Sequence, residues 1–233
     1  MDKGIELFDA YNIRARLSAS IILLAPIAIS VFLCLEEVRS LATSAVILIV
    51  LLAFANCVPI LQRRHRKRKN TETKDRAYEL LLRTDKTFDS ATKERYYDKL
   101  ASLDESFLPL KESDNNDEFA ELCKSAVLFL RNRTRDNRLV LEENINYGFC
   151  RNLMETKTTG IWVCGLCLVS VAIGSWLMFG SLCQIPVQNV FAFIADLGIL
   201  LFWLFGIKDE DVEQAALNYA RTLVMAIDTL NAE

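Results

Sequence analysis

Four long stretches of this 233-residue chain carry few or no charged side chains, namely residues 17–35, 41–61, 160–182 and 187–207. The hydrophobic residues, 52% of the total, gather in these blocks, whereas a soluble domain distributes them in periodic stripes. As α-helices the blocks would each be about 28 to 35 Å long, which is enough to cross the hydrocarbon core of a bilayer. The pattern therefore predicts an all-α membrane protein with four membrane-spanning helices.

The four spans are expected to form two hairpins. Only residues 36–40 separate the first two, and Gln184 to Pro186 turns the second pair. The first block is followed by acidic residues and a second apolar block rather than a small-residue cleavage site, which argues against a secretory signal peptide. We thus divide the chain into an N-terminal hairpin, a middle domain, a second hairpin and a C-terminal helix, at residues 1–61, 62–158, 159–207 and 208–233.

Lysine and arginine are unevenly distributed between the segments outside the spans. Residues 62–158 hold 21 of the 27, and a basic run from Arg63 to Lys69 directly follows the second block. Because such residues are enriched on the cytoplasmic side, the middle domain and both termini are predicted to face the cytoplasm from a bacterial inner membrane. The basic run suits contact with anionic membrane lipid, and direct contact with nucleic acid is the alternative.

Helical periodicity and capping residues predict further helices in the middle domain, and no strand pattern is present there. Asp89 and Ser90 are candidate N-caps for the second of these helices. Residues 105–117, which contain Pro109 and a polar run, are predicted to form a loop. The predicted helices cover residues 71–84, 91–104, 117–134 and a segment that begins near Arg138 and runs almost into the third span.

Both ends of the chain have amphipathic patterns. Residues 1–16 alternate apolar and charged side chains and suit a short lead-in on the membrane surface. The C-terminal segment begins with acidic residues at Asp209, which suit the first turn of a helix, and then presents one apolar stripe. That stripe is predicted to pack on the middle domain or on a neighbouring subunit.

Asp196 is an ionisable residue inside the fourth span. A charge in hydrocarbon costs several kcal/mol unless it faces protein or water, so Asp196 is a candidate pore or gate residue. The alternatives are a structural hydrogen bond to a Ser, Thr or Asn of another helix and a position at the wetter outer edge. Asn56 in the second span is a weaker candidate of the same kind.

The seven cysteines do not predict a metal or disulfide site. An odd number of cysteines in a reducing compartment argues against a disulfide framework. Cys164 and Cys167 have a metal-binding or redox spacing, but they lie inside an apolar span without a second pair, so packing is the favoured interpretation. We expect no metal and no cofactor.

The richest candidate binding segment lies between residues 131 and 152. On a helix, Arg131, Arg135 and Arg138 would share one face. Guanidinium groups bind phosphates in pairs of hydrogen bonds, and aromatic rings stack on bases, which suits a cyclic nucleotide or a short single-stranded ligand. The alternative is a network of ion pairs that fixes the domain above the membrane, with four arginines facing three carboxylates. These residues are Arg131, Arg135, Arg138 and Arg151 against Asp136, Glu142 and Glu143.

Enzyme motifs are missing from the sequence. It has no phosphate-binding glycine loop, no GxSxG elbow and no HExxH sequence. The single histidine, His65, lies in the basic run, which disfavours a histidine-based nucleophile triad. We therefore expect a protein that is not an enzyme.

Several short segments are similar to recurring features of a widespread family of small bacterial membrane proteins. The most specific is Tyr147-Gly148-Phe149 followed by Arg151-Asn152. Cys150 departs from the family pattern, in which arginine is usual, and Glu155-Thr156 stands where Gly-Leu is usual. The similar segments span most of the chain and comprise Ala10–Arg16, Leu82–Asp85, Thr92–Tyr96, Thr134–Asp136, Glu142–Asn144 and Tyr147–Leu153.

This family resembles the membrane effectors of bacterial anti-phage systems, most closely the effector of Hailong-type defence. The resemblance implies an oligomeric channel, a tetramer, that is held closed by short single-stranded DNA oligomers made by a partner nucleotidyltransferase. Loss of the oligomers on infection opens the channel and depolarises the cell. The implied oligonucleotide site on the cytoplasmic domain comprises Arg131, Arg135, Arg138, Tyr147, Arg151 and Asn152.

A membrane-anchored binding or scaffold module is the alternative function. Such a protein would recruit a partner through its cytoplasmic domain, and its spans would serve only as anchors. Exchange of the spans for unrelated ones would then leave the function intact.

Overall fold

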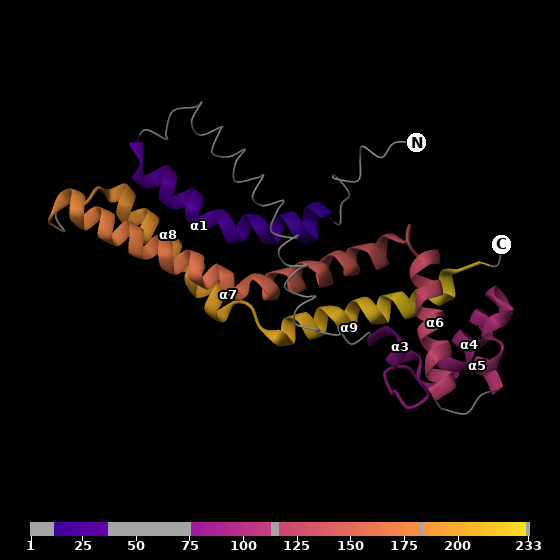
Figure 1. Cartoon of the computed structure of the whole chain (residues 1–233). Coiled ribbons are helices and arrows are strands. Elements are labelled where there is room, and N and C mark those ends of the chain that lie inside the picture. The colour runs from indigo at the N-terminus through magenta and orange to yellow at the C-terminus, as the bar shows by residue number, and fades with distance from the viewer. Residues whose placement is uncertain (1–11, 37–75, 113–116, 182–183, 232–233) are drawn as a thin grey trace, which may run out of the picture. The chain divides into compact units, whose positions relative to one another are not determined.

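The computed structural model describes residues 12–36, 76–112, 117–181 and 184–231 (Figure 1). All regular elements in these ranges are helices and the ranges contain no strand, which confirms the predicted all-helical class. The predicted second span, the lead-in up to residue 11 and the basic run lie outside the described ranges. The α-helices are α1 (Ser18–Cys34), α3 (Arg76–Leu81), α4 (Ser90–Leu103), α5 (Pro109–Glu112), α6 (Asp117–Arg133), α7 (Arg138–Phe179), α8 (Val187–Phe205) and α9 (Asp209–Met225).

Shorter helical turns extend three of these elements. A π-helical turn over Asn12–Leu17 precedes α1, a 3₁₀ turn over Glu105–Phe107 precedes α5, and another over Ala226–Thr229 follows α9. The chain divides into two compact units. In the described part of the chain, the apolar unit holds residues 12–36 and 148–211, and the polar unit holds residues 76–147 and 212–231 apart from 113–116. Helices α7 and α9 each contribute residues to both units.

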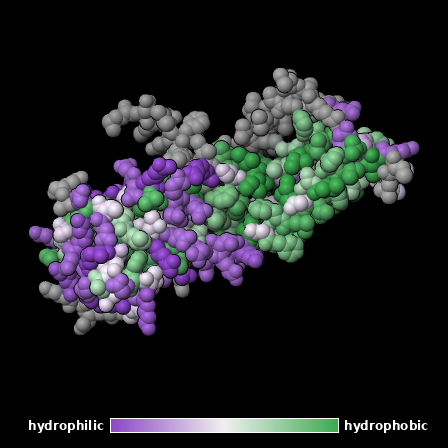
Figure 2. Space-filling model, turned by 180° about the vertical axis from the view of Figure 1, so that it is seen from behind, coloured by the Kyte–Doolittle hydropathy of each residue, from purple (hydrophilic) through white to green (hydrophobic). Residues whose placement is uncertain are grey.

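In the described part of the chain, three helices are long and apolar enough to cross a membrane, namely α1 with part of the turn before it (Arg14–Cys34), α7 and α8. In the most apolar stretch of each helix 22% of the residues are buried, and the others are half-buried or exposed and contribute to the hydrophobic surface in Figure 2. An exposed apolar surface of this extent is typical of contact with lipid. The helices thus suggest a multi-pass membrane protein, in agreement with the hydropathy pattern.

The predicted ends of the third and fourth spans are a few residues too long. The sequence predicts a third span up to residue 182, but α7 ends at Phe179 because Gly180 adopts a φ of 63°. Glycine enters this left-handed region without steric cost and commonly terminates helices. Helix α8 ends at Phe205, where the sequence predicts an end at residue 207.

Polar side chains cross-link the helices of the apolar unit. Near one end of the apolar part of α7, the Asn152 amide donates to the Ala15 carbonyl at 2.8 Å, and the Lys157 ammonium donates to the Ile207 carbonyl at 2.6 Å. Towards the other end, the Asn189 amide of α8 donates to the Ser175 hydroxyl of α7 at 2.9 Å. These bonds satisfy polar groups that hydrocarbon would not solvate, so they fix how α7 packs against its neighbours.

The polar unit has its own hydrophobic core between α3, α4, α6 and α9. The apolar stripe of the C-terminal segment packs into this core, which confirms the first of its two predicted positions. Ala220 and Val224 also belong to the buried face of α9. The largest fully buried side chains of the core are Leu81, Tyr97, Leu100, Leu110, Phe119, Val127, Leu130, Leu223, Val224 and Ile227.

Residues 105–112 are helical, so the prediction of a loop over 105–117 is wrong for them. Phe107 and Leu110 are buried and anchor the two short helical segments to the core. Pro109 stands at the first position of α5, where a residue without an N–H group leaves no helical hydrogen bond unmade. The predicted helix over 71–84 also ends early, since α3 ends at Leu81.

Candidate functional site

The arginine-rich segment divides between two helices and the turn that joins them. Helix α6 ends at Arg133, and the hydroxyl of buried Thr134 donates to the Leu130 carbonyl at 2.7 Å. The Asn137 side chain then accepts a hydrogen bond from the Leu139 N–H at 3.0 Å, so that α7 begins at Arg138. Side chains of this kind end and start helices because they compete for backbone partners.

The predicted common helical face of Arg131, Arg135 and Arg138 is therefore wrong. Arg131 lies near the end of α6, Arg135 lies in the turn, and Arg138 is the first residue of α7. Arg135 and Arg138 are exposed, and neither guanidinium group has a hydrogen bond or an ion pair with another described residue. The turn thus presents two free cationic groups, which is a suitable arrangement for an anionic ligand.

Tyr147 belongs to the polar unit and packs on Tyr219 of α9. The two rings are nearly parallel, with an angle of 7° between their planes and 6.2 Å between their centroids. Tyr147 is half-buried. Stacking of this kind fixes the orientation of the ring.

The last two predicted ligand residues belong to the apolar unit. Arg151 forms an ion pair with Glu155 at 3.2 Å, which differs from the acidic partners in the predicted ion-pair network. Asn152 is buried, and its amide is used by the bond to the Ala15 carbonyl. The structure therefore places Arg151 in an ion pair along α7 and Asn152 in a bond between α7 and the segment before α1.

Asp196 is fully buried among the helices of the apolar unit. The Ser30 hydroxyl of α1 donates to Asp196 Oδ2 at 2.5 Å, so a hydrogen bond to a serine of another helix is present, as one of the interpretations of this residue predicts. Oδ1 has no hydrogen-bond partner in the described ranges. Asn56, the other candidate pore residue, lies outside those ranges.

Cys164 and Cys167 of α7 lie near this carboxylate. Cys164 is fully buried and Cys167 half-buried, and both interact electrostatically with Asp196. In the described part of the chain, no group of three or more His, Cys, Asp or Glu side chains is arranged to hold a metal ion.

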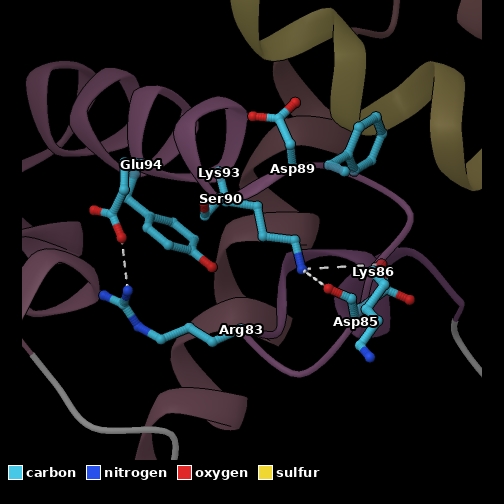
Figure 3. A pocket seen from close by; sticks show the side chains of 9 residues that line it. Arg83, Asp85, Lys86, Asp89, Ser90, Lys93 and Glu94 are labelled. Atoms are coloured by element: carbon cyan, nitrogen blue, oxygen red, sulfur yellow. Dashed lines mark hydrogen bonds and ion pairs between the residues drawn. The ribbon is translucent and has the colours of Figure 1, made fainter.

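A cavity of about 320 Å³ lies in the polar unit beside the start of α4 (Figure 3). We call it the α4 cavity. It lies where the loop between α3 and α4 folds against the first two turns of α4. The lining residues are Arg83, Asp85, Lys86, Phe88, Asp89, Ser90, Lys93, Glu94 and Tyr97.

Lys93 holds the loop that forms one wall of the α4 cavity. Its side chain is almost fully buried, and the ammonium donates to the Leu82 carbonyl at 2.5 Å and to the Asp85 carbonyl. Burial lowers the pKa of Lys93, and the negative charge of Asp85 opposes this shift. The ammonium therefore serves as a fixed cross-link between the loop and α4.

Arg83 and Asp89 fix the other walls of the cavity. Arg83 donates to the Glu94 carboxylate at 2.6 Å and to the Leu110 carbonyl at 3.1 Å, and its guanidinium lies 5.1 Å from the centre of the Tyr97 ring. Asp89 is the N-cap of α4, since its carboxylate accepts from the Thr92 N–H at 2.8 Å, and this bond lowers the pKa of Asp89. The cavity is thus formed by side chains that are already held in place.

No sequence motif marks the α4 cavity as a site. Its only local signal is the density of charge over residues 83–94, which a solvated helix face also produces. Comparison of the chain with protein-family models, with curated proteins and with solved structures found no match.

Proposed function

We propose that this protein is an oligomeric, ligand-gated membrane pore that acts as an effector of bacterial anti-phage defence. In this proposal its polar unit lies in the cytoplasm and binds a nucleotide or a short single-stranded DNA oligomer made by a partner nucleotidyltransferase. Gating of the pore by this ligand depolarises the membrane. The tetrameric state and the DNA ligand come from the family resemblance.

The observation that carries the proposal is the continuity of α7. This helix runs over 42 residues, from Arg138 through Tyr147 into the apolar segment, and ends at Phe179. At the usual rise it is about 63 Å long, about twice the thickness of a hydrocarbon core. It contains no proline, so a movement at its polar end is transmitted to the apolar end along one backbone.

Hydrogen bonds would pass this movement on to the other spans. Asn152 ties α7 to the residue before α1, and Lys157 ties it to the end of α8. If α7 shifts along its axis or rotates about it, these bonds must either break or move their partner residues with α7. They suit a two-state element whose equilibrium a ligand shifts by binding one state more tightly.

An assembly of several copies is needed for a pore. Most residues in the apolar stretches of α1, α7 and α8 are half-buried or exposed in one copy, and a few spans enclose no obvious transport path alone. Copies that associate through part of this surface would line a path with the remainder. Homo-oligomerisation in the membrane is thus part of the proposal.

The test is ion flux through purified protein in liposomes. We expect potassium flux, and we expect addition of single-stranded DNA oligomers to change its rate. Absence of flux at every ligand concentration, from protein that is shown to be folded and inserted, would contradict the pore. Flux that no nucleotide or oligomer changes would contradict the gating.

Replacement of Arg135 and Arg138 together by alanine is expected to weaken binding of a single-stranded oligomer. Both guanidinium groups are exposed and unpaired within the described ranges. Each lost phosphate contact should make the slope of log affinity against log salt shallower by about 0.7, measured by fluorescence anisotropy in detergent. Arg221→Ala is the matched control, because this exposed arginine lies two residues beyond Tyr219 and on the other side of α9. An unchanged slope in the double variant would exclude the turn from the ligand site.

Asp196→Asn separates the pore from the scaffold alternative. Asparagine retains an oxygen that accepts the Ser30 hydrogen bond and removes the ionisable carboxyl group. Because bonds between membrane helices are worth only about 0.6 kcal/mol on average, stability should change little. A pore is expected to show altered conductance in this variant, whereas a membrane-anchored scaffold would retain full activity. Single-channel recording with a parallel thermal melt in detergent measures both quantities.

A further inference from the structure

We propose that the α4 cavity binds a nucleobase, so that the polar unit reads the identity of one base in its ligand. The inference rests on the proposed function, since it assigns a base-reading site to the nucleotide or oligomer that gates the pore. The site is separate from the α6–α7 turn, whose free arginines suit phosphates.

The balance of charge in the cavity favours a neutral ligand. Three cationic side chains line it, Arg83, Lys86 and Lys93, and three carboxylates face them, from Asp85, Asp89 and Glu94. A formal charge of zero gives no net attraction for a phosphate dianion. A nucleobase is neutral and has hydrogen-bond donors and acceptors on its edge, which suits a wall that also presents both kinds of group.

Several polar groups of the wall retain the capacity to bind such an edge. The Lys86 ammonium and the Ser90 hydroxyl have no hydrogen bond within the described ranges. Asp85 uses one carboxylate oxygen for the Thr87 N–H at 2.8 Å and the other for the Thr87 hydroxyl at 3.2 Å. Each carboxylate oxygen accepts more than one hydrogen bond, so Asp85 remains an acceptor next to the free donor of Lys86.

The cavity also has an aromatic wall with a fixed orientation. Phe88 lines the cavity, and its ring packs edge-to-face on Tyr96 with 5.7 Å between centroids and an angle of 81°. Tyr97 lies behind this wall, because its ring is fully buried and its hydroxyl donates to the Leu81 carbonyl at 2.5 Å. A flat base gains free energy by contact with an aromatic ring such as that of Phe88 whatever its identity, and the polar wall then selects among bases.

The volume suits a small part of an oligomer. At about 320 Å³ the cavity is at the lower end of the range for small-molecule sites, so most of an oligomer must lie outside it. Lys93 and Arg83 are already bonded to backbone carbonyls and to Glu94, so they position the wall rather than contact the ligand. A cavity held in this way loses little entropy when a ligand binds, and this favours discrimination.

The experiment compares the four single-stranded DNA homo-oligomers of one length on full-length protein in detergent, by fluorescence anisotropy. We expect one of the four to bind about ten- to a hundredfold more tightly than the weakest, which is the discrimination that a good pair of base contacts supplies. Phe88→Leu and Lys86→Ala should each reduce this ratio to near one. Lys99→Ala is the matched control on α4, since Lys99 does not line the cavity.

Three results would overturn the inference. They are equal binding of all four homo-oligomers by the unmodified protein, a ratio that survives in both cavity variants, and competition by inorganic phosphate at the cavity. Binding of the four nucleosides to the unmodified full-length protein, measured by isothermal titration calorimetry, separates the two proposals. Nucleoside binding without oligomer binding would retain the cavity and contradict the proposed gating ligand, and binding of neither would contradict both.

Discussion

Phe119→Ala is expected to remove most of the stability of the polar unit. Phe119 is fully buried in α6, packs edge-to-face on Tyr97 with 5.8 Å between ring centroids, and lies 5.5 Å from the Arg83 guanidinium. Truncation of a buried phenylalanine costs about 3 to 5 kcal/mol, because apolar contact is lost and a cavity remains. That is a large fraction of the 5 to 15 kcal/mol that stabilises a typical domain.

Cys123 supplies a local measurement of this loss. It lies in the same helix and is fully buried, and burial raises the pKa of its thiol to about 12, although Lys93 and Arg83 oppose the shift. At pH 8 only about one thiol in ten thousand is then ionised in the folded unit, so a maleimide reacts mainly after the unit opens. Modification of Cys123, followed by peptide mass spectrometry on the full chain in detergent, should accelerate roughly a hundred- to several-thousandfold in Phe119→Ala.

The pH for Cys123 labelling is chosen from the direction in which burial shifts the pKa of the thiol. Because the thiol pKa is higher in the folded state, the folded unit retains a proton that the unfolded chain releases above its own thiol pKa of about 8.5. The thiol therefore lowers stability as the pH rises beyond that value, and pH 8 lies below this window.

Leu128→Ala on the same helix is the control for Phe119→Ala. Leu128 is 59% exposed, so its truncation should change stability by no more than about 0.5 kcal/mol. Equal labelling rates of Cys123 in the two variants would show that Phe119 does not hold the core. The α4 cavity should also lose its shape in Phe119→Ala, since the Phe119 ring supports both Arg83 and Tyr97.

Local signals predicted most helices of the polar unit. Asp89 begins α4 because a carboxylate three residues before a free N–H group caps it, and this interaction depends on adjacent residues alone. The failure over residues 105–112 has a tertiary cause. Phe107 and Leu110 become buried in a core that is built from distant segments, and this burial stabilises short helices that a polar, proline-containing sequence does not predict.

The roles of individual polar side chains depend on partners that the sequence does not indicate. Asn152 was predicted to bind the ligand, but its amide bonds to the carbonyl of Ala15, 137 residues away. The ion-pair alternative sets Arg151 against Asp136, Glu142 and Glu143, whereas its ion pair is with Glu155. Motif similarity identifies such residues as candidates. Only the packing of the helices distinguishes a ligand contact from a structural bond.

The sequence does not predict the α4 cavity, for the same reason. Its polar wall exists because buried Lys93 bends the loop after α3 onto the start of α4 through two backbone carbonyls. A lysine among exposed charges has no pattern that distinguishes it from its neighbours. Burial of Lys93 is a property of the fold and becomes visible only in the structure.

Gly160→Ala is expected to disrupt the packing of α7 on α8. Gly160 lies against the fully buried indole of Trp203, and a Cβ at position 160 would lie 2.6 Å from Cδ2 and 2.8 Å from Nε1 of that ring. A rigid indole cannot yield as the end of a flexible side chain can, so the helices must separate. Overpacking of this kind costs about 1 to 3 kcal/mol and outweighs the gain of up to about 1 kcal/mol from replacing a helical glycine by alanine.

The emission of Trp203 measures this change directly. In a background with Trp162→Phe and Trp176→Phe, Trp203 is the only tryptophan, so a shift of its emission reports a change in its burial. We expect a red shift and a lower thermal transition in detergent for Gly160→Ala. Gly165→Ala, on the same helix with no atom within 4 Å of the added Cβ, should leave the emission unchanged and the stability equal or slightly higher.

A second-site change tests whether the indole is the cause of the loss. Trp203→Leu removes the ring atoms that the new methyl group of Gly160→Ala would meet. Gly160→Ala should therefore lower the stability of the Trp203→Leu variant by less than it lowers the stability of the unmodified protein. Additive effects of the two substitutions would show that Gly160 is required for another reason.

Because α7 carries the polar segment and is bonded to the ends of α1 and α8, a variant that separates α7 from α8 should also lose the response of ion flux to ligand, whereas Gly165→Ala should retain it.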